Sequence, residues 1–89
     1  MERYFTNQAD EEYQTWRKSD KKIFKRINKL IDSIEENGFL QGIGKPEQLK
    51  HFTEPVYSRR IDKKNRLVYC PYNDNDLLII SCKDHYQDT

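Results

Sequence analysis

The 89-residue sequence lacks the features that mark several classes of protein. It has no run of about eighteen apolar residues, which a membrane-spanning helix would need, and no signal-peptide pattern opens it. It has no internal repeat and no low-complexity segment. Its apolar residues, although only 35% of the total, are clustered and periodic, which argues against disorder. We therefore expect one cytoplasmic domain over residues 1–89 that does not contact a membrane.

Cysteine is also scarce, with only Cys70 and Cys82 present. In the strand pairing argued below, Cys70 faces Ile79 and Cys82 faces Leu67, so the two thiols do not oppose each other and no disulfide is expected. We expect both to be free and to serve as small core residues. No closely spaced pair of ligands supports a zinc site among the cysteines and histidines, so neither a metal nor another cofactor is expected.

An excess of one charge is absent too, because sixteen basic residues meet fifteen acidic ones. A nucleic-acid partner is therefore not indicated by the total, only by segregation of the charges. Such segregation is visible between residues 17 and 29, where Lys22, Lys25 and Lys29 fall on one line of the second predicted helix, and Lys18 extends that line by one turn if the break between the helices is mild. A solvated surface is the commoner meaning of such a line, and a track for a phosphate backbone or an acidic partner is the alternative.

Two helices are predicted in the first half of the chain, after a short strand within residues 1–6. Thr6 or Asn7 can cap the first helix, and Asp20 interrupts and caps again. The second helix has the clearest periodicity, with Ile23, Ile27, Leu30, Ile31 and Ile34 on one stripe. Gly38 is suited to its end. We expect an antiparallel helix pair whose apolar stripes pack on a sheet.

Three strands are predicted in the second half, over residues 56–61, 66–72 and 77–82, where β-branched and aromatic residues gather between polar turns. If both connections are hairpins, the loop lengths give the register. The pairs expected from that count are Ile61 with Arg66, Arg59 with Val68, Tyr72 with Leu77, Val68 with Ser81 and Arg66 with Lys83. An antiparallel sheet and two helices make an α+β fold.

This register gathers polar groups at one end of the sheet. Arg66 and Lys83 lie there, His85 is one step further, and Tyr86 is beside them, which makes a small cationic site with one titratable imidazole. The loop over residues 42–47 brings Lys45 and a carboxylate, Glu47, before the sheet resumes, and Lys50 follows. A carboxylate on a short, stiff loop near cations is a candidate general base.

These residues occur in blocks that resemble a known family, and the likeness covers most of the chain. The blocks, in order, are Gly42-Ile43-Gly44-Lys45-Pro46-Glu47-Gln48-Leu49-Lys50, Ser58-Arg59-Arg60-Ile61, Asn65-Arg66-Leu67-Val68-Tyr69 and Ser81-Cys82-Lys83-Asp84-His85-Tyr86. The ensemble resembles the YoeB/Txe group of the RelE superfamily, the ribosome-dependent mRNA endonuclease toxins of bacterial toxin–antitoxin pairs.

The resemblance implies a compact fold of a strand, a helix pair and a mostly antiparallel sheet. It also implies cleavage of mRNA in the ribosomal A site, neutralisation by a cognate antitoxin of the YefM kind, and a tendency to form homodimers. By position, Glu47 matches the family's general base, Arg66 its phosphate-binding arginine, His85 its general acid and Tyr86 its terminal tyrosine. Lys50 and Arg60 match basic residues close to that site.

Three departures from the family pattern bear on activity. Many relatives have Glu-His before the Arg-Leu-Val-Tyr block, where this chain has Lys64-Asn65. The usual Leu-Ser-Gly turn is replaced by residues 52–55, and residues 87–89 extend beyond the tyrosine. Two alternatives therefore stay open: a toxin of this fold that poisons DNA gyrase by binding, and a weakened protein that only binds an antitoxin or RNA.

Overall fold

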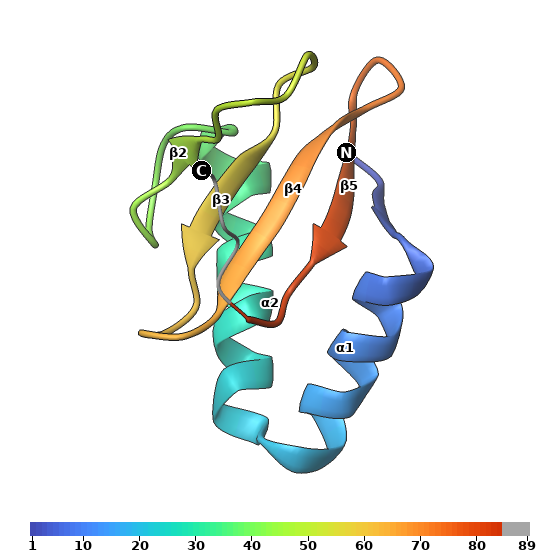
Figure 1. Cartoon of the computed structure of the whole chain (residues 1–89), viewed down its shortest axis with the longest axis vertical. Coiled ribbons are helices and arrows are strands. Elements are labelled where there is room, and N and C mark those ends of the chain that lie inside the picture. Colours follow the sequence, from blue (N-terminus) through green and yellow to red (C-terminus); the bar gives the residue numbers. More distant parts are fainter. Residues whose placement is uncertain (85–89) are drawn as a thin grey trace.

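The computed structural model describes residues 1–84 and has seven elements, five strands in one mixed sheet and two helices. Figure 1 shows their arrangement. In chain order they are β1 (Arg3–Phe5), α1 (Asn7–Ser19), α2 (Lys21–Asn37), β2 (Glu47–Gln48), β3 (Tyr57–Arg60), β4 (Arg66–Tyr72) and β5 (Asp76–Ser81). The strand order is β1-β5-β4-β3-β2, in which β1 runs parallel to β5 and the other neighbours are antiparallel. The predicted α+β fold is confirmed. No helix within residues 1–84 combines the length and the apolar content needed to cross a bilayer.

Side-chain caps set the limits of the helices where the sequence predicted them. Thr6 accepts a hydrogen bond from the amide of Ala9 at 3.0 Å, and Asp20 accepts from the amides of Lys22 and Ile23 at 3.1 Å. Gly38 ends α2 with a φ of 96°, a conformation that costs glycine little. Figure 1 shows the two helices running in opposite directions, as predicted.

Within residues 1–84 the helices cover one face of the sheet, and no helix lies on the other. The stripe of α2 (Ile27, Leu30, Ile31 and Ile34) packs in one core with side chains of the sheet, namely Ile61, Leu67, Tyr69, Leu77 and Ile79. A smaller cluster of Leu49, Val56 and Val68, with Cys70 and Ile80 against it, forms apart from that core. Because side chains alternate along a strand, Leu67 and Tyr69 define the helix face of β4. Arg66, Val68 and Cys70 therefore lie on the opposite face. We call it the open face because no helix of residues 1–84 lies on it, although Leu49 and Val56 pack with Val68 there.

The register predicted for β3 and β4 is wrong by one residue. The structure pairs Arg60 with Arg66 and Arg59 with Leu67, where Ile61 with Arg66 and Arg59 with Val68 were expected. The loop is longer than predicted, because Ile61 belongs to it and donates its amide to the carbonyl of Asn65 at 3.0 Å. A slip of one residue exchanges the two faces of a strand, so Arg59 points to the helix side and is fully buried.

The register predicted for β4 and β5 is right at one point and wrong beyond it. Val68 pairs with Ser81 as expected, but an irregularity between Val68 and Tyr69 shifts the rest of the ladder. Tyr72 thus pairs with Asp76 in place of Leu77, and Cys70 with Leu78 in place of Ile79. Both cysteines are free, as predicted, although Cys70 is only half-buried while Cys82 is fully buried.

Candidate functional site

Basic and acidic candidates share the open face of the sheet. The prediction that Glu47 lies on a loop is wrong. Glu47 lies in the edge strand β2, where it pairs with Ser58. Ser58 in turn pairs with Val68, so Glu47 lies on the face that also presents Arg66. Two strand spacings and one two-residue step separate Glu47 from Arg66, which is roughly 12 Å between their Cα atoms.

Arg60 and Arg66 form a directly opposed pair on the same face. Opposed residues place their Cβ atoms about 4.5–5.5 Å apart, and like charges at that position destabilise a sheet. No ion pair within residues 1–84 neutralises either guanidinium, since the salt bridges there join Arg3 to Asp32 and Glu35. Two facing arginines without an acidic partner are suited to a bound anion, because the guanidinium fork matches the oxygens of a phosphate.

The guanidinium of Arg66 rests on backbone carbonyls and not on a carboxylate. Its Nη1 donates to the carbonyl oxygen of Asp62 at 3.1 Å and to that of Asn65 at 3.4 Å. The Asp62 carboxylate is engaged elsewhere, by the amides of Lys64 and Asn65 and by the Asn65 side chain. Burial raises the pKa of Asp62, but these hydrogen bonds outweigh it and leave the pKa below its usual value.

The C-terminal end of β5 lies beside Arg66, as predicted, although the detail differs. The strand ladder ends at Ser81, and the amide of Arg66 donates to the carbonyl of Asp84, not to that of Lys83. The amide of Asp84 donates to Oδ1 of Asn65 at 2.7 Å. Lys83 is exposed, and so are Lys45 and Lys50. His85 and Tyr86 lie outside the described residues, so their roles stay predictions.

Helix α1 fixes the strand end from the other side, which sequence reasoning missed. Glu12 accepts a hydrogen bond from the amide of Cys82 at 2.8 Å, and Nε1 of Trp16 donates to the carbonyl of Cys82 at 2.8 Å. Both backbone groups of Cys82 are therefore held by side chains of one helix. Burial, with a smaller contribution from the charge of Glu12, raises the pKa of the Cys82 thiol to about 12.

The structural role of Arg59 was also not predicted from the sequence. Its side chain makes five hydrogen bonds: to Tyr69 Oη, to Ser33 Oγ and to the carbonyls of Gly38, Gln41 and Ile43, at 2.6–3.0 Å. All five guanidinium N–H groups are thereby satisfied. Arg59 ties the loop that leads to β2, and so to Glu47, against the core. The adjacent arginines in Ser58-Arg59-Arg60 carried a signal, since alternation sends one of two consecutive strand residues inward.

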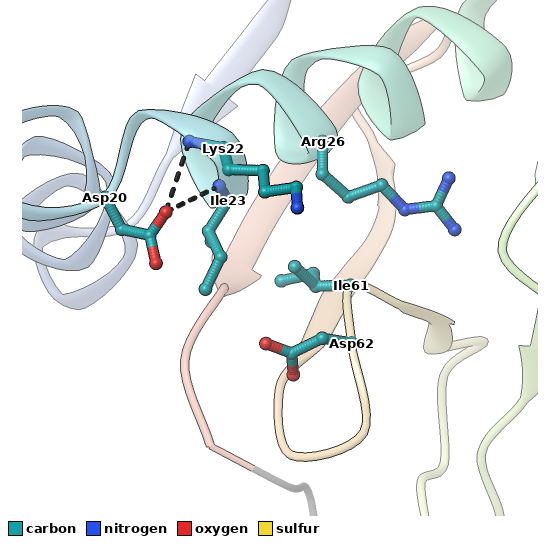
Figure 2. A pocket seen from close by; sticks show the side chains of 6 residues that line it. All are labelled: Asp20, Lys22, Ile23, Arg26, Ile61 and Asp62. Carbon is teal, nitrogen blue, oxygen red and sulfur yellow. Dashed lines mark hydrogen bonds between the residues drawn. The ribbon is translucent and has the colours of Figure 1, made fainter.

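A shallow hollow of about 440 Å³ opens between α2 and the β3–β4 turn (Figure 2). It is lined by Asp20, Lys22, Ile23, Arg26, Ile61 and Asp62. Figure 2 shows the side chains of Lys22 and Arg26 extending along one side, above Ile61 and Asp62. A second hollow of about 270 Å³ is lined only by basic residues, Lys22, Lys25, Arg26 and Lys29. We call these four residues the α2 basic surface.

The α2 basic surface begins in the first turn of α2. Lys22 lies in that turn, where the helix dipole disfavours a cation and where Asp20, at the N-cap, is the nearby acidic residue. None of its four residues forms an ion pair within residues 1–84. In the same part of the chain, no group of three or more His, Cys, Asp or Glu side chains is placed to hold a metal ion.

Comparison with known proteins gives a consistent match along nearly the whole chain. A family model described as the YoeB-like toxin of bacterial type II toxin–antitoxin systems matches residues 5–86. Toxin YoeB of Synechocystis sp. is 49% identical over 83 residues, covering 93% of this chain and 94% of the relative. Toxin YoeB of Escherichia coli K12 is 41% identical over 86 residues, covering 97% and 100%.

Solved structures agree in fold. The YoeB dimer from Staphylococcus aureus superposes with a TM-score of 0.89 at 49% identity, covering 97% of this chain and 98% of that one. The YoeB–YefM complex from the same organism gives 0.87 at 48% identity, with the same coverage. A YoeB/ParE toxin from Agrobacterium tumefaciens gives 0.89 at 33% identity, covering 97% and 100%.

Proposed function

The chain belongs to the YoeB-like toxin family of bacterial type II toxin–antitoxin systems, and we propose that it is an endoribonuclease that cleaves mRNA in the ribosomal A site. The observation that carries the proposal is the opposed pair of Arg60 and Arg66 on the open face, which also holds Glu47. The pair offers two unneutralised guanidinium groups to a phosphate, and Glu47 adds a carboxylate that can accept a proton.

The chemistry needs an acid and a base but no other nucleophile than the RNA itself. Glu47 accepts the proton of the 2′-hydroxyl, whose oxygen attacks the adjacent phosphorus. The bond from phosphorus to the 5′-oxygen breaks, and His85 gives its proton to that leaving oxygen. The products are a 2′,3′-cyclic phosphate and a free 5′-hydroxyl, so protons and bonds balance without a metal or other cofactor.

Charge that grows on the phosphate in the transition state is stabilised by Arg66, helped by Arg60 and Lys50. Arg66 is suited to this task because its guanidinium rests on neutral carbonyls, so its full charge remains for the substrate. Lys45 and Lys83 add positive potential at the rim. Tyr86 stacks on a substrate base, which is worth about 1–3 kcal/mol in other single-strand binders.

The partners we propose are a homodimeric second copy, an antitoxin of the YefM kind, and the ribosome with its mRNA in the cytoplasm. The first two follow from solved Staphylococcus aureus relatives, which are described as a YoeB dimer and as YoeB–YefM complexes. The α2 basic surface supplies a contact with ribosomal or messenger RNA, since its four cations lie together and form no ion pair within residues 1–84.

A toxin of the same fold that acts by binding is the second candidate. One solved relative at 33% identity, described as a YoeB/ParE toxin, shares this fold, so the fold alone does not decide between a nuclease and a gyrase poison. A binding toxin has no need of Glu47, Arg66 and His85 as an acid–base set, and this favours the nuclease.

Mapping of transcript 5′ ends after induction of the protein tests the proposal. We expect growth arrest together with new mRNA ends inside translated codons, and no new ends with the variant Arg66→Ala expressed to the same level. Growth arrest with intact mRNA and damaged DNA would establish the gyrase poison instead. Normal growth of cells that make the protein without an antitoxin, together with antitoxin binding by the purified protein, would identify a weakened toxin.

A further inference from the structure

The turn between β3 and β4 is built around one carboxylate. Oδ1 of Asp62 accepts hydrogen bonds from the amides of Lys64 at 2.8 Å and Asn65 at 2.7 Å. The side-chain amide of Asn65 donates to both carboxylate oxygens of Asp62, at 3.1 and 3.2 Å. These bonds leave residues 62–65 little freedom, because backbone and side chain are tied to the same group.

Asn65 connects this turn to the strand end that leads toward His85. It is 8% exposed, and its Oδ1 accepts from the amide of Asp84 at 2.7 Å. The carbonyl of Asp84 accepts in turn from the amide of Arg66 at 3.0 Å. Asn65 and Arg66, adjacent in sequence, therefore hold both backbone groups of Asp84.

The guanidinium of Arg66 is oriented by the same turn. The two carbonyls to which it donates belong to Asp62 and Asn65, the residues that the carboxylate holds in place. Arg3 shows the contrasting arrangement, since its guanidinium is bound to the carboxylates of Glu35 at 2.7 Å and Asp32 at 3.2 Å. A carboxylate at Arg66 would compete with a substrate phosphate, whereas a carbonyl orients the fork and leaves its charge available.

We propose that Asp62 and Asn65 are positioning residues for Arg66, and that Asn65 also fixes the strand end at Asp84 relative to it. The proposal rests on the endoribonuclease function for its kinetic test. Lys64 donates its backbone amide to Asp62, and its charge also helps to lower the pKa of that carboxyl. Asn65 hydrogen-bonds both Asp62 and Asp84, so it is the residue of the Lys64-Asn65 pair that links the turn to the strand end.

Asn65→Leu removes every side-chain bond at that position, and Asp62→Asn keeps the shape of the turn while removing its charge. Asn28→Leu is a matched control, because Asn28 is half-buried and makes two hydrogen bonds, to Tyr13 and to the carbonyl of Phe24, away from the site. Single-turnover cleavage on programmed ribosomes, with protein concentration varied, separates the chemical rate from binding.

We expect Asn65→Leu to lower the saturated cleavage rate about 100-fold, since a displacement of about 1 Å in a catalytic group has an effect of that size. Asp62→Asn should lower it several-fold, and the half-saturating concentration should change less than about threefold in both. Asn28→Leu should keep the wild-type rate although it also loses thermal stability. A wild-type rate in Asn65→Leu would overturn the proposal.

A second measurement does not depend on activity. Relaxation of the Arg66 Nε–H signal by NMR reports how rigidly the guanidinium is held. We expect its order parameter to fall in Asn65→Leu and Asp62→Asn and to stay unchanged in Asn28→Leu. An unchanged order parameter in the first two variants would refute the positioning role, whereas inactivity of the wild type with the expected NMR change would refute only the nuclease.

Discussion

Arg59 and Tyr69 lie side by side within the core, and Nε of Arg59 donates a 2.8 Å hydrogen bond to the hydroxyl of Tyr69. That hydroxyl donates to the carbonyl of Phe39 at 2.7 Å, and the guanidinium carbon is 5.7 Å from the centre of the tyrosine ring. Burial raises the pKa of Tyr69, although the hydrogen bond and charge of Arg59 act against it. A buried cation is thus held by neutral acceptors and one ring.

Replacing Arg59 should therefore reduce the free energy of unfolding even when the positive charge is kept. Lysine has three N–H donors where the guanidinium of Arg59 has five, so in Arg59→Lys at least two of the five buried or part-buried acceptors lose this partner, at about 1–3 kcal/mol each. We expect a loss of about 2–4 kcal/mol in the free energy of unfolding, measured with urea. Arg60→Lys, one residue along and exposed, should stay within about 0.5 kcal/mol of the wild type. Equal losses in the two variants would contradict this account.

The two thiols should differ from exposed cysteines in their reaction with iodoacetamide. The thiolate is the reactive form, and a pKa of about 12 leaves Cys82 almost wholly protonated at pH 8. Cys70 is half-buried, and burial raises the pKa of its thiol. It should react faster than Cys82 but slower than the cysteine of an unstructured peptide. Mass spectrometry after timed labelling would show this order. In urea both should react alike, and early labelling of Cys82 in the folded protein would count against its burial.

The α2 basic surface should carry part of the salt dependence of ribosome binding. Each phosphate contact contributes roughly 0.7–0.9 to the slope of log affinity against log salt. Lys25→Glu together with Lys29→Glu should weaken binding and reduce that slope by about 1.5 or more. Arg17→Glu together with Lys63→Glu makes the same change in net charge on exposed side chains outside this surface. If both double variants behave alike, only net charge matters, and the surface is a solvated one.

Substitutions at the proposed acid and phosphate-binding residues should separate chemistry from docking. His85→Gln removes a proton donor, which typically lowers the rate about 10²–10⁴-fold. Arg66→Ala removes a charge that stabilises the transition state, at about 10²–10³-fold. Glu47→Gln should be milder, since water can accept the 2′-proton. Single-turnover cleavage at saturating protein would measure these rates, and antitoxin binding by His85→Gln should persist. A wild-type rate for His85→Gln would remove its role as the acid.

The sequence by itself determined the helices and the list of candidate residues. The stripe of α2 and the caps at Thr6, Asp20 and Gly38 are local signals, since each depends on residues within a few positions. The ordered blocks from residue 42 onward indicated the family, which the matched relatives confirm. The free cysteines were predicted from the strand register, which is wrong by one at Cys70, but Cys70 still pairs with Leu78 and not with Cys82.

Only the tertiary structure decided which way the strand residues point. The β3–β4 loop is one residue longer than the polar stretch suggested, and the irregularity beside Val68 shifts the next ladder by one. Because side chains on a strand alternate with a period of two, each shift exchanges faces. The shift between β3 and β4 places Arg59 in the core and sets Arg60 opposite Arg66. The pinning of Cys82 by Glu12 and Trp16 joins residues about seventy positions apart, and no local pattern encodes such a contact.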